Sequence, residues 1–281
     1  MGIIWLASYP KSGNTWLRAF LANYFTDAQE PVDINQLPDF CFGENHVPWF
    51  EMANGGKSVA GLDDAQIAQL RPKAQMALAR HRPHDILVKT HNAVAHVFDQ
   101  PMINPSVTSG AVYVIRNPLD VAVSYAHHLG ISQAEMAENM AAPSYAVAGH
   151  DHMVFQYLGD WSAHVKSWVD APGLRLHTMR YEDMLSKPGP GFTKLIKFMG
   201  LKKNVPRLTR SLKFSNFKTL KGQEQKGGFV EKSREADAFF RKGQAGGWRE
   251  ELEPDLVKRI LDDHGEMMDR FGYLDKNGDP R

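Results

Sequence analysis

Residues 3–20 read IIWLASYPKSGNTWLRAF, and this stretch decides the fold. The apolar run from Ile3 to Ala7 is typical of a buried strand, and the text from Thr15 onward has the spacing of a helix. Between them, Lys-Ser-Gly lets the backbone turn tightly and leaves the N–H groups at the helix start pointing outward, while Lys11 adds a mobile positive charge. The stretch predicts an anion-binding loop, although a plain strand, turn and helix with an incidental lysine stays open.

The order of lysine and glycine separates this loop from the common nucleotide-binding P-loop. That loop reads G-x-x-x-x-G-K-[ST], with the lysine after the second glycine. Here Lys11 precedes Gly13, and no glycine lies five residues before it. No Walker-type loop or strand-end Asp for Mg²⁺ is visible either, so a P-loop nucleotide kinase is the less favoured alternative.

Composition indicates a globular protein without a strong charge. With 281 residues and 43% hydrophobic content, the chain can bury one substantial core. The formal net charge of +1 gives no global field for nucleic acid or a membrane surface. The single cysteine, Cys41, excludes an intrachain disulfide and fits a reducing compartment. No signal-peptide layout is present, and no apolar stretch approaches the roughly 20 residues that span a bilayer. We expect a cytoplasmic protein.

Short apolar runs alternate with helical patterns along the chain. We expect strands at 3–7, 85–89, 111–115 and 174–179, and helices at 15–24, 63–80, 118–129, 153–169, 192–199 and 254–270. This alternation predicts an α/β fold with a P-loop-like parallel sheet and helices on both faces. No boundary or repeat is visible, so we expect one domain over residues 1–281. Ligands of such sheets bind beyond the carboxyl ends of the strands.

A histidine follows the second predicted strand. The run 85–89 continues into Thr90 and His91 and ends in Lys89. Histidine suits a general base because its ordinary pKa lies near neutrality. Since His91 follows a strand at the same sheet edge as Lys11, we single it out among the 12 histidines as the candidate base.

An arginine follows the third predicted strand. Arg116 ends the run 111–115, and Asn117-Pro118 begins a helix that carries Ser124 in its first two turns. A guanidinium fork and a hydroxyl suit a phosphate monoester. Pairing of Arg116 with Asp120 is the structural alternative.

In combination these segments resemble the PAPS-dependent sulfotransferase family, where PAPS is 3′-phosphoadenosine 5′-phosphosulfate. The family's loop reads Y-P-K-S-G-T-T-W, and this chain departs from it only at Asn14. Its K-T-H is matched at 89–91 and its R-N-P/A-x-D-V-x-V-S-Y at 116–125. Further motifs match in order at 159–168, 181–184, 215–217 and 241–248, so the resemblance spans residues 3 to about 250.

The resemblance implies a cofactor site by position. Lys11 to Trp16 would hold the 5′-phosphosulfate, other residues the 3′-phosphate, and three more the adenosine. The implied cofactor residues are Lys11, Ser12, Gly13, Asn14, Thr15, Trp16, Arg116, Ser124, Tyr181, Ser215, Phe217, Arg241, Lys242 and Gly243. The product would be 3′,5′-ADP, and no metal is implied.

The chemistry implied is sulfuryl transfer to a small-molecule alcohol, phenol or amine. In this hypothesis His91 deprotonates the acceptor, Lys11 neutralises charge on the bridging oxygen, and Lys89 hydrogen-bonds the sulfuryl oxygens. Ser12 would steer Lys11 between the phosphate and the bridge. A catalytically silent nucleotide-binding scaffold of the same fold is the non-enzymatic alternative.

Three segments show no sustained hydrophobic period, and the sequence also departs from the family's motifs at two places that bear on function. We expect 26–62 and 131–151 to frame the acceptor pocket and 221–247 to form a lid over the cofactor. The large apolar residues of the first two segments either line that pocket or belong to the core: Phe40, Phe42, Trp49, Phe50, Met136, Met140 and Tyr145. Gly247 replaces an acidic residue, which puts the anchoring of the lid in doubt. The family's dimerisation motif does not follow Trp248, so the sequence predicts no oligomeric state.

Overall fold

The computed structural model describes residues 2–281, which group into two compact units. Of the described residues, 2–9, 41–113 and 140–178 form the first unit, and 10–40, 114–139 and 179–281 form the second. Each unit is therefore assembled from segments that are far apart in the sequence. No helix among residues 2–281 is long and apolar enough to cross a membrane.

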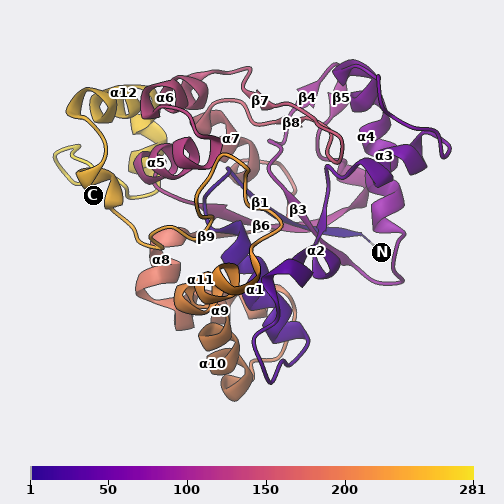
Figure 1. The fold of residues 1–281 in the computed structure, drawn as a ribbon, viewed down its shortest axis with the longest axis horizontal. Helices are drawn as coiled ribbons and strands as arrows, with labels where there is room; N and C mark the ends of the chain where they lie inside the picture. The colour runs from indigo at the N-terminus through magenta and orange to yellow at the C-terminus, as the bar shows by residue number, and fades with distance from the viewer. Residues whose placement is uncertain (1) are drawn as a thin grey trace. The chain divides into compact units, whose positions relative to one another are not determined.

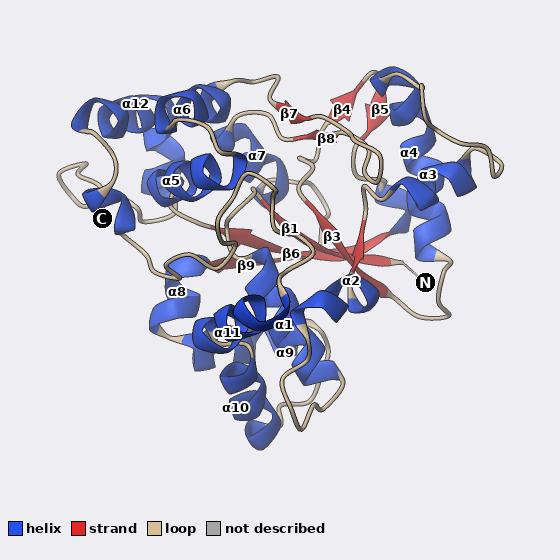
Figure 2. Ribbon diagram, in the orientation of Figure 1, coloured by secondary structure: helices blue, strands red, loops and turns tan. Residues whose placement is uncertain are grey.

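A five-stranded sheet in the order β2-β3-β1-β6-β9 contains all four predicted strands (Figure 2). The strands are β1 Ile3–Ser8, β2 Phe42–Gly43, β3 Ile86–Thr90, β6 Thr108–Ile115 and β9 Leu176–Arg180. β1 pairs in parallel with β3, from Ile3 opposite Ile86 to Ala7 opposite Thr90, and β2 also pairs in parallel with β3. Every residue of β1 is buried, which explains why its sequence is continuously apolar from Ile3 to Ala7. The predicted α/β class is confirmed.

The first unit packs two helices against each other over an apolar cluster. Its smaller elements are α3 Val47–Ala53, α4 Asp64–Ala79, α7 Trp161–Val169, the pairs β4 His96–Val97 with β5 Gln100–Pro101 and β7 Ala146–Val147 with β8 Gln156–Tyr157, and the 3-10 turn η2 Pro105–Val107. α3 lies against α4 (Figure 1). Phe50, Ile67 and Phe155 are among the buried residues of this cluster. Phe50 is thus core.

The second unit holds most of the helices. They are α1 Asn14–Phe25, α2 Leu37–Phe40, α5 Pro118–Leu129, α8 Tyr181–Ser186, α9 Pro188–Phe198, α10 Val205–Phe214, α11 Phe217–Gly227 and α12 Pro254–Arg270, with the 3-10 turns η1 Ile34–Gln36 and η3 Gly247–Glu250. α6 Gln133–Ala141 runs from this unit into the first. α10 packs against α1, α9 and α11 (Figure 1). Phe229 and Phe240 join α1 and α11 in one buried cluster.

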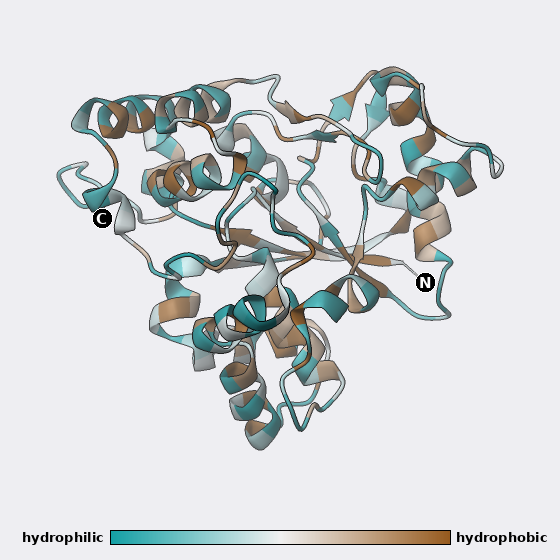
Figure 3. Ribbon diagram, in the orientation of Figure 1, coloured by the Kyte–Doolittle hydropathy of each residue, from teal (hydrophilic) through white to brown (hydrophobic). Residues whose placement is uncertain are grey.

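Local signals set several helix ends as predicted. Asn117 caps α5, its side chain accepting a hydrogen bond from Leu119 N, and Pro118 is the first helical residue. α12 has the predicted bounds, and Gly272 follows it in the left-handed conformation at φ 69°. Brown and teal alternate along α12 in Figure 3, as expected for a helix with one buried stripe.

The prediction of one helix over 153–169 is wrong in its first half. The helix there, α7, begins only at Trp161, because Gly159 is left-handed at φ 65° and the Asp160 side chain caps Ala163 N. Val154 and Leu158 are buried, but they precede the helix. Their helical spacing is coincidental.

The three segments without a sustained period contain more regular structure than expected. Residues 26–62 include η1, α2, β2 and α3, residues 131–151 include α6, and α11 extends into 221–247. These elements are short or polar, so an apolar repeat cannot develop over several turns. Met136 and Met140 of α6 are fully buried.

Candidate functional site

The loop after β1 has the backbone of an anion-binding nest. Lys11 is left-handed at φ 63° and Gly13 at φ 105°, and Gly13 is the N-cap of α1. Leu17 N makes the first hydrogen bond of the helix, to Gly13 O at 3.1 Å, so the N–H groups before it face out of the helix end. Consecutive N–H groups at a positive helix end favour an anion.

Two donors in this loop are buried without a partner. Ser12 Oγ and Trp16 Nε1 have no hydrogen-bond partner among residues 2–281. Buried polar groups are normally paired, so orphaned donors in a loop of this shape fit a polar ligand. A Cβ on Gly13 would lie 2.7 Å from Tyr181 Cδ2, so only glycine fits this turn. Asn14 and Thr15 are buried in the first turn of α1.

Lys11 and Trp16 have aromatic neighbours in the second unit. Lys11 Nζ lies 3.8 Å from the centroid of the Phe239 ring, a cation–π contact. Trp16 meets the edge of Tyr181 with ring centroids 6.0 Å apart and lies 5.9 Å from Phe192. Burial raises the pKa of the Tyr181 hydroxyl, which stays protonated at neutral pH.

Arg116 links the loop to the segment before η3. Its guanidinium donates to Lys11 O at 2.9 Å and to Gln244 O at 3.1 Å, and it lies 4.5 Å from the centroid of the Tyr181 ring. Arg116 Nε is buried without a partner among the described residues. Asp120 instead binds backbone N–H groups, so the alternative pairing with Arg116 is not the arrangement observed. Ser124 is half-buried on α5.

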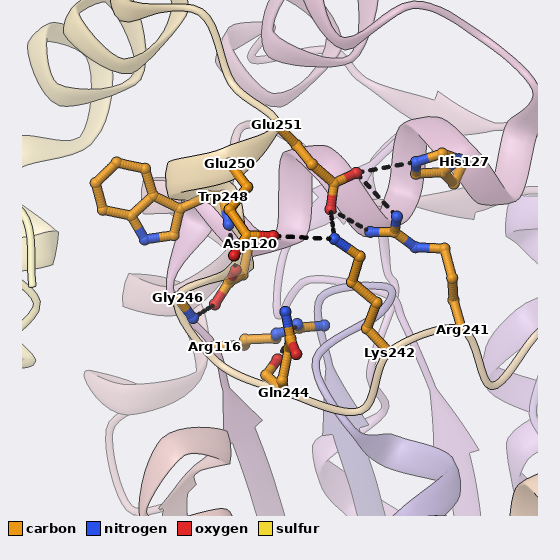
Figure 4. A network of polar contacts seen from close by, with 10 residues as sticks. All are labelled: Arg116, Asp120, His127, Arg241, Lys242, Gln244, Gly246, Trp248, Glu250 and Glu251. Carbon is orange, nitrogen blue, oxygen red and sulfur yellow. Dashed lines mark hydrogen bonds and ion pairs between the residues drawn. The ribbon is translucent and has the colours of Figure 1, made fainter.

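Asp120 anchors the loop before Trp248, which the sequence left in doubt. Its carboxylate accepts hydrogen bonds from Gly246 N at 2.7 Å and Trp248 N at 3.2 Å (Figure 4). The acidic residue missing at Gly247 is thus not needed to tie this loop, because a carboxylate on α5 does so.

Arg241 and Lys242 both contact Glu251, and Gly243 contacts Phe217. The Glu251 carboxylate receives a fork from Arg241 at 2.8 and 2.9 Å and a third bond from Lys242 at 2.8 Å (Figure 4). Gly243 is left-handed at φ 62°, and a Cβ there would lie 2.1 Å from the Phe217 ring. The ring therefore packs directly on the glycine.

All fourteen residues implied at the cofactor lie in the second unit. Ser215 is fully buried at the end of α10, where its hydroxyl donates to Ser211 O at 2.8 Å. Tyr181 begins α8. His91 and Lys89 lie in the first unit.

His91 is held in one tautomer. Its Nδ1 lies 2.7 Å from Ser8 O and 3.3 Å from Ser8 Oγ. A carbonyl oxygen can only accept, so Nδ1 carries the proton and Nε2 keeps its lone pair. This is the tautomer that a general base needs. Ser8 precedes Lys11 by three residues along the chain.

Helix α7 fixes the backbone at His91 through two ring donors. His164 Nε2 donates to His91 O at 3.0 Å, and its Nδ1 accepts from the Tyr113 hydroxyl at 2.9 Å. Trp168 Nε1 donates to Asn92 O at 3.0 Å. Burial lowers the pKa of His164 to about 4, opposed by its bond to the His91 carbonyl. The His-Val-x-x-Trp spacing thus places two donors behind residues 91 and 92.

Buried, neutral His164 gives the protein a specific acid sensitivity. The unfolded chain takes up this proton near pH 6.5, whereas the folded chain does so only near pH 4. The contribution of His164 to stability is therefore complete above pH 6.5, and about 3 kcal/mol is lost as the pH falls to 4. Urea unfolding of the wild type and His164→Gln across this range should show a steeper loss in the wild type. Equal pH slopes would contradict the assignment.

A buried polar network that was not predicted from the sequence lies beside His91. Glu44 and Arg71 form an ion pair with both side chains 0% exposed. Glu44 also accepts from Asn92 Nδ2 at 2.8 Å and Gln75 Nε2 at 3.0 Å. The signal was present, because Arg71 and Gln75 continue the buried stripe of α4 from Ile67 at helical spacing.

Lys89 and the candidate acceptor residues other than Phe50, Met136 and Met140 are partly exposed. Lys89 is half-buried in β3, opposite Gly43 of β2, while Val88 and Thr90 are buried. Phe42 and Trp49 form an edge-on aromatic group with His81, with ring centroids 5.2 to 5.6 Å apart. Phe40 and Tyr145 are half-buried. In the described part of the chain, no group of three or more His, Cys, Asp or Glu side chains could hold a metal.

The fold and the loop define a P-loop-like nucleotide-binding α/β protein, in which the strand order reverses beside β1, where such sheets bind ligands. A sequence profile of the sulfotransferase domain matches residues 2–272, and the chain belongs to this family of enzymes.

The chain is similar to known sulfotransferases at low identity. It is 27% identical to sulfotransferase 1A1 of Canis lupus familiaris, over 95% of this chain and 83% of the relative. It is 25% identical to flavonol 3-sulfotransferase of Flaveria bidentis, over 92% of this chain and 78% of the relative. Its fold is similar to that of retinol dehydratase in complex with androsterone and the inactive cofactor PAP, with a TM-score of 0.65 and 21% identity over 98% of this chain and 83% of the other.

Proposed function

We propose that this chain transfers the sulfuryl group of PAPS to a hydroxyl or amine of a small-molecule acceptor, with His91 as the general base. The observation that carries the proposal is the 2.7 Å contact between His91 Nδ1 and the Ser8 carbonyl oxygen, which can only accept, so that Nδ1 carries the proton and Nε2 carries the lone pair of a base. Bound PAPS would supply the activated sulfuryl group. His91 Nε2 would take the proton of the acceptor during in-line attack.

The residues of the second unit fit a doubly phosphorylated nucleotide. The N–H groups from Ser12 to Trp16 and the orphaned Ser12 hydroxyl suit the 5′ side, where Lys11 would offset the charge on the bridging oxygen. Arg116, Ser124 and residues 241–243 suit the 3′-phosphate, and Tyr181, Ser215 and Phe217 the adenosine. Lys89 would hydrogen-bond the sulfuryl oxygens. The complex of retinol dehydratase with PAP supports this choice of nucleotide.

The acceptor belongs to the class of small-molecule alcohols, phenols and amines. A flavonol 3-sulfotransferase among the relatives supports this class. We propose that residues 1–281 act as one sulfotransferase-like domain, in which 26–62 and 131–151 line the acceptor pocket and 221–247 closes over the cofactor. A cytoplasmic location fits the cytosolic naming of relatives from Arabidopsis thaliana.

Replacing Arg116 tests the nucleotide assignment. By calorimetry, the wild type should bind 3′,5′-ADP more tightly than ATP with Mg²⁺, and Arg116→Ala should weaken 3′,5′-ADP binding by about tenfold or more. A charged hydrogen bond to phosphate typically contributes about 1.5–3 kcal/mol, and its loss leaves a dianion short of a partner. Arg175→Ala, which replaces an exposed arginine of the first unit, is the control.

Two outcomes would redirect the proposal. A preference for ATP with Mg²⁺ would favour a nucleotide kinase. Tight binding of 3′,5′-ADP without transfer of labelled sulfate to any of a panel of phenols, alcohols and amines would favour a silent scaffold. An affinity unchanged in Arg116→Ala would place the 3′-phosphate elsewhere.

A further inference from the structure

We propose that Glu251 is a specificity-determining residue of the nucleotide site: its carboxylate binds Arg241 and Lys242 and competes with the 3′-phosphate for them. This inference rests on the proposed function, because that function assigns the 3′-phosphate to these two residues. Glu251 thereby weakens the binding of nucleotides that carry a 3′-phosphate and leaves the binding of other adenine nucleotides unchanged.

Glu251 engages both terminal nitrogens of the Arg241 guanidinium, which is the first observation in support. Both terminal nitrogens of Arg241 donate to it, NH1 to Oε2 at 2.8 Å and NH2 to Oε1 at 2.9 Å. Lys242 Nζ lies 2.8 Å from Oε1, and His127 Nε2 lies 3.3 Å from Oε2 (Figure 4). A phosphate monoester is best bound by the same bidentate fork. It cannot form that fork while the carboxylate holds it.

The second support is the charge and burial of Glu251. Its side chain is 17% exposed, against 75% for the neighbouring Glu250, whose carboxylate is 3.7 Å from Lys242. Burial works against ionisation of Glu251, but the hydrogen bonds from Arg241, Lys242 and His127 prevail and lower its pKa to about 2. Glu251 is therefore a permanent anion at neutral pH. A carboxylate and a phosphate bound to the same Arg241 guanidinium would repel each other. One anion therefore displaces the other, and the two do not bind together.

The third support is that the backbone bearing the two cations is tied independently of Glu251. Phe239 N and Phe240 N donate to the Glu224 carboxylate at 2.6 and 2.9 Å, and Lys221 Nζ donates to Arg241 O at 3.1 Å. Release of Glu251 therefore frees the ends of Arg241 and Lys242 without releasing their backbone. The exchange needs side-chain rotation only, and its reversal favours departure of the product nucleotide.

Calorimetry with two nucleotides on the full chain tests the proposal. Glu251→Gln, an isosteric change, should bind 3′,5′-ADP about tenfold more tightly than the wild type and bind 5′-AMP equally well. Glu253→Gln removes the same charge from an exposed position two residues away and should change neither affinity. In a crystal structure of the wild type with 3′,5′-ADP, the Arg241–Glu251 fork should be broken.

The opposite results have distinct meanings. Weaker or unchanged 3′,5′-ADP binding in Glu251→Gln, or an intact Arg241–Glu251 fork in the complex, would show that Glu251 positions the two cations instead of competing, and would overturn this inference alone. A wild type that binds 3′,5′-ADP no better than 5′-AMP would overturn the nucleotide assignment, and the inference with it.

Discussion

We expect His91→Ala to lower kcat for sulfuryl transfer by about 10²–10⁴-fold, because a positioned general base contributes about 3–5 kcal/mol to the chemical step. The affinity for 3′,5′-ADP stays at the wild-type value, since every residue assigned to the nucleotide lies outside the unit that contains His91. Steady-state transfer of labelled sulfate from PAPS gives kcat, and calorimetry gives the affinity.

A second histidine supplies the matched control for this loss. His96 is exposed in β4 of the same unit, so His96→Ala should keep wild-type turnover. Normal turnover in His91→Ala would remove His91 from the role of base. A joint loss of turnover and nucleotide affinity would instead make it a structural residue.

We expect Glu44→Ala to destabilise the protein by about 3–5 kcal/mol, because it leaves the Arg71 guanidinium in the core without its carboxylate partner. The same change removes the partner of Asn92, the residue after His91, so turnover should fall in the fraction that remains folded. Urea unfolding gives the free energy, and labelled-sulfate transfer gives the rate.

Replacing both charges separates the ion pair from simple packing. Glu44→Gln with Arg71→Met leaves no buried charge and should recover most of the stability lost in Glu44→Ala. A double variant as unstable as the single one would show that the loss comes from packing at Glu44. Wild-type stability in Glu44→Ala would contradict the buried pair.

Strong local signals made much of the fold predictable. β1 is buried on both faces, so its continuous apolar sequence identifies it as a strand. Asn117-Pro118 and Pro254 identify the starts of two helices. The helix predicted from 153 failed because Val154 and Leu158 are buried by tertiary packing, which spacing cannot distinguish from a helical stripe.

The site was predictable where one residue type is required and unpredictable where partners meet across long sequence distances. Gly13 and Gly243 have left-handed backbone conformations and pack against aromatic rings. Both conditions require glycine, so these positions can be recognised in the sequence. Nothing in the amino-acid sequence shows that Glu251, rather than Glu250, contacts Arg241. The acceptor pocket was not predictable either, because Phe50 is core whereas Trp49 beside it is partly exposed.

A crystal structure of the complex with 3′,5′-ADP tests the central claim most directly, through the position of the 5′-phosphate relative to His91 Nε2. We expect the 5′-phosphate on the N–H groups of residues 12–16, with Nε2 separated from it by the space of one sulfuryl group and one acceptor oxygen. A 5′-phosphate held elsewhere, or an imidazole whose Nε2 points away from it, would contradict the account.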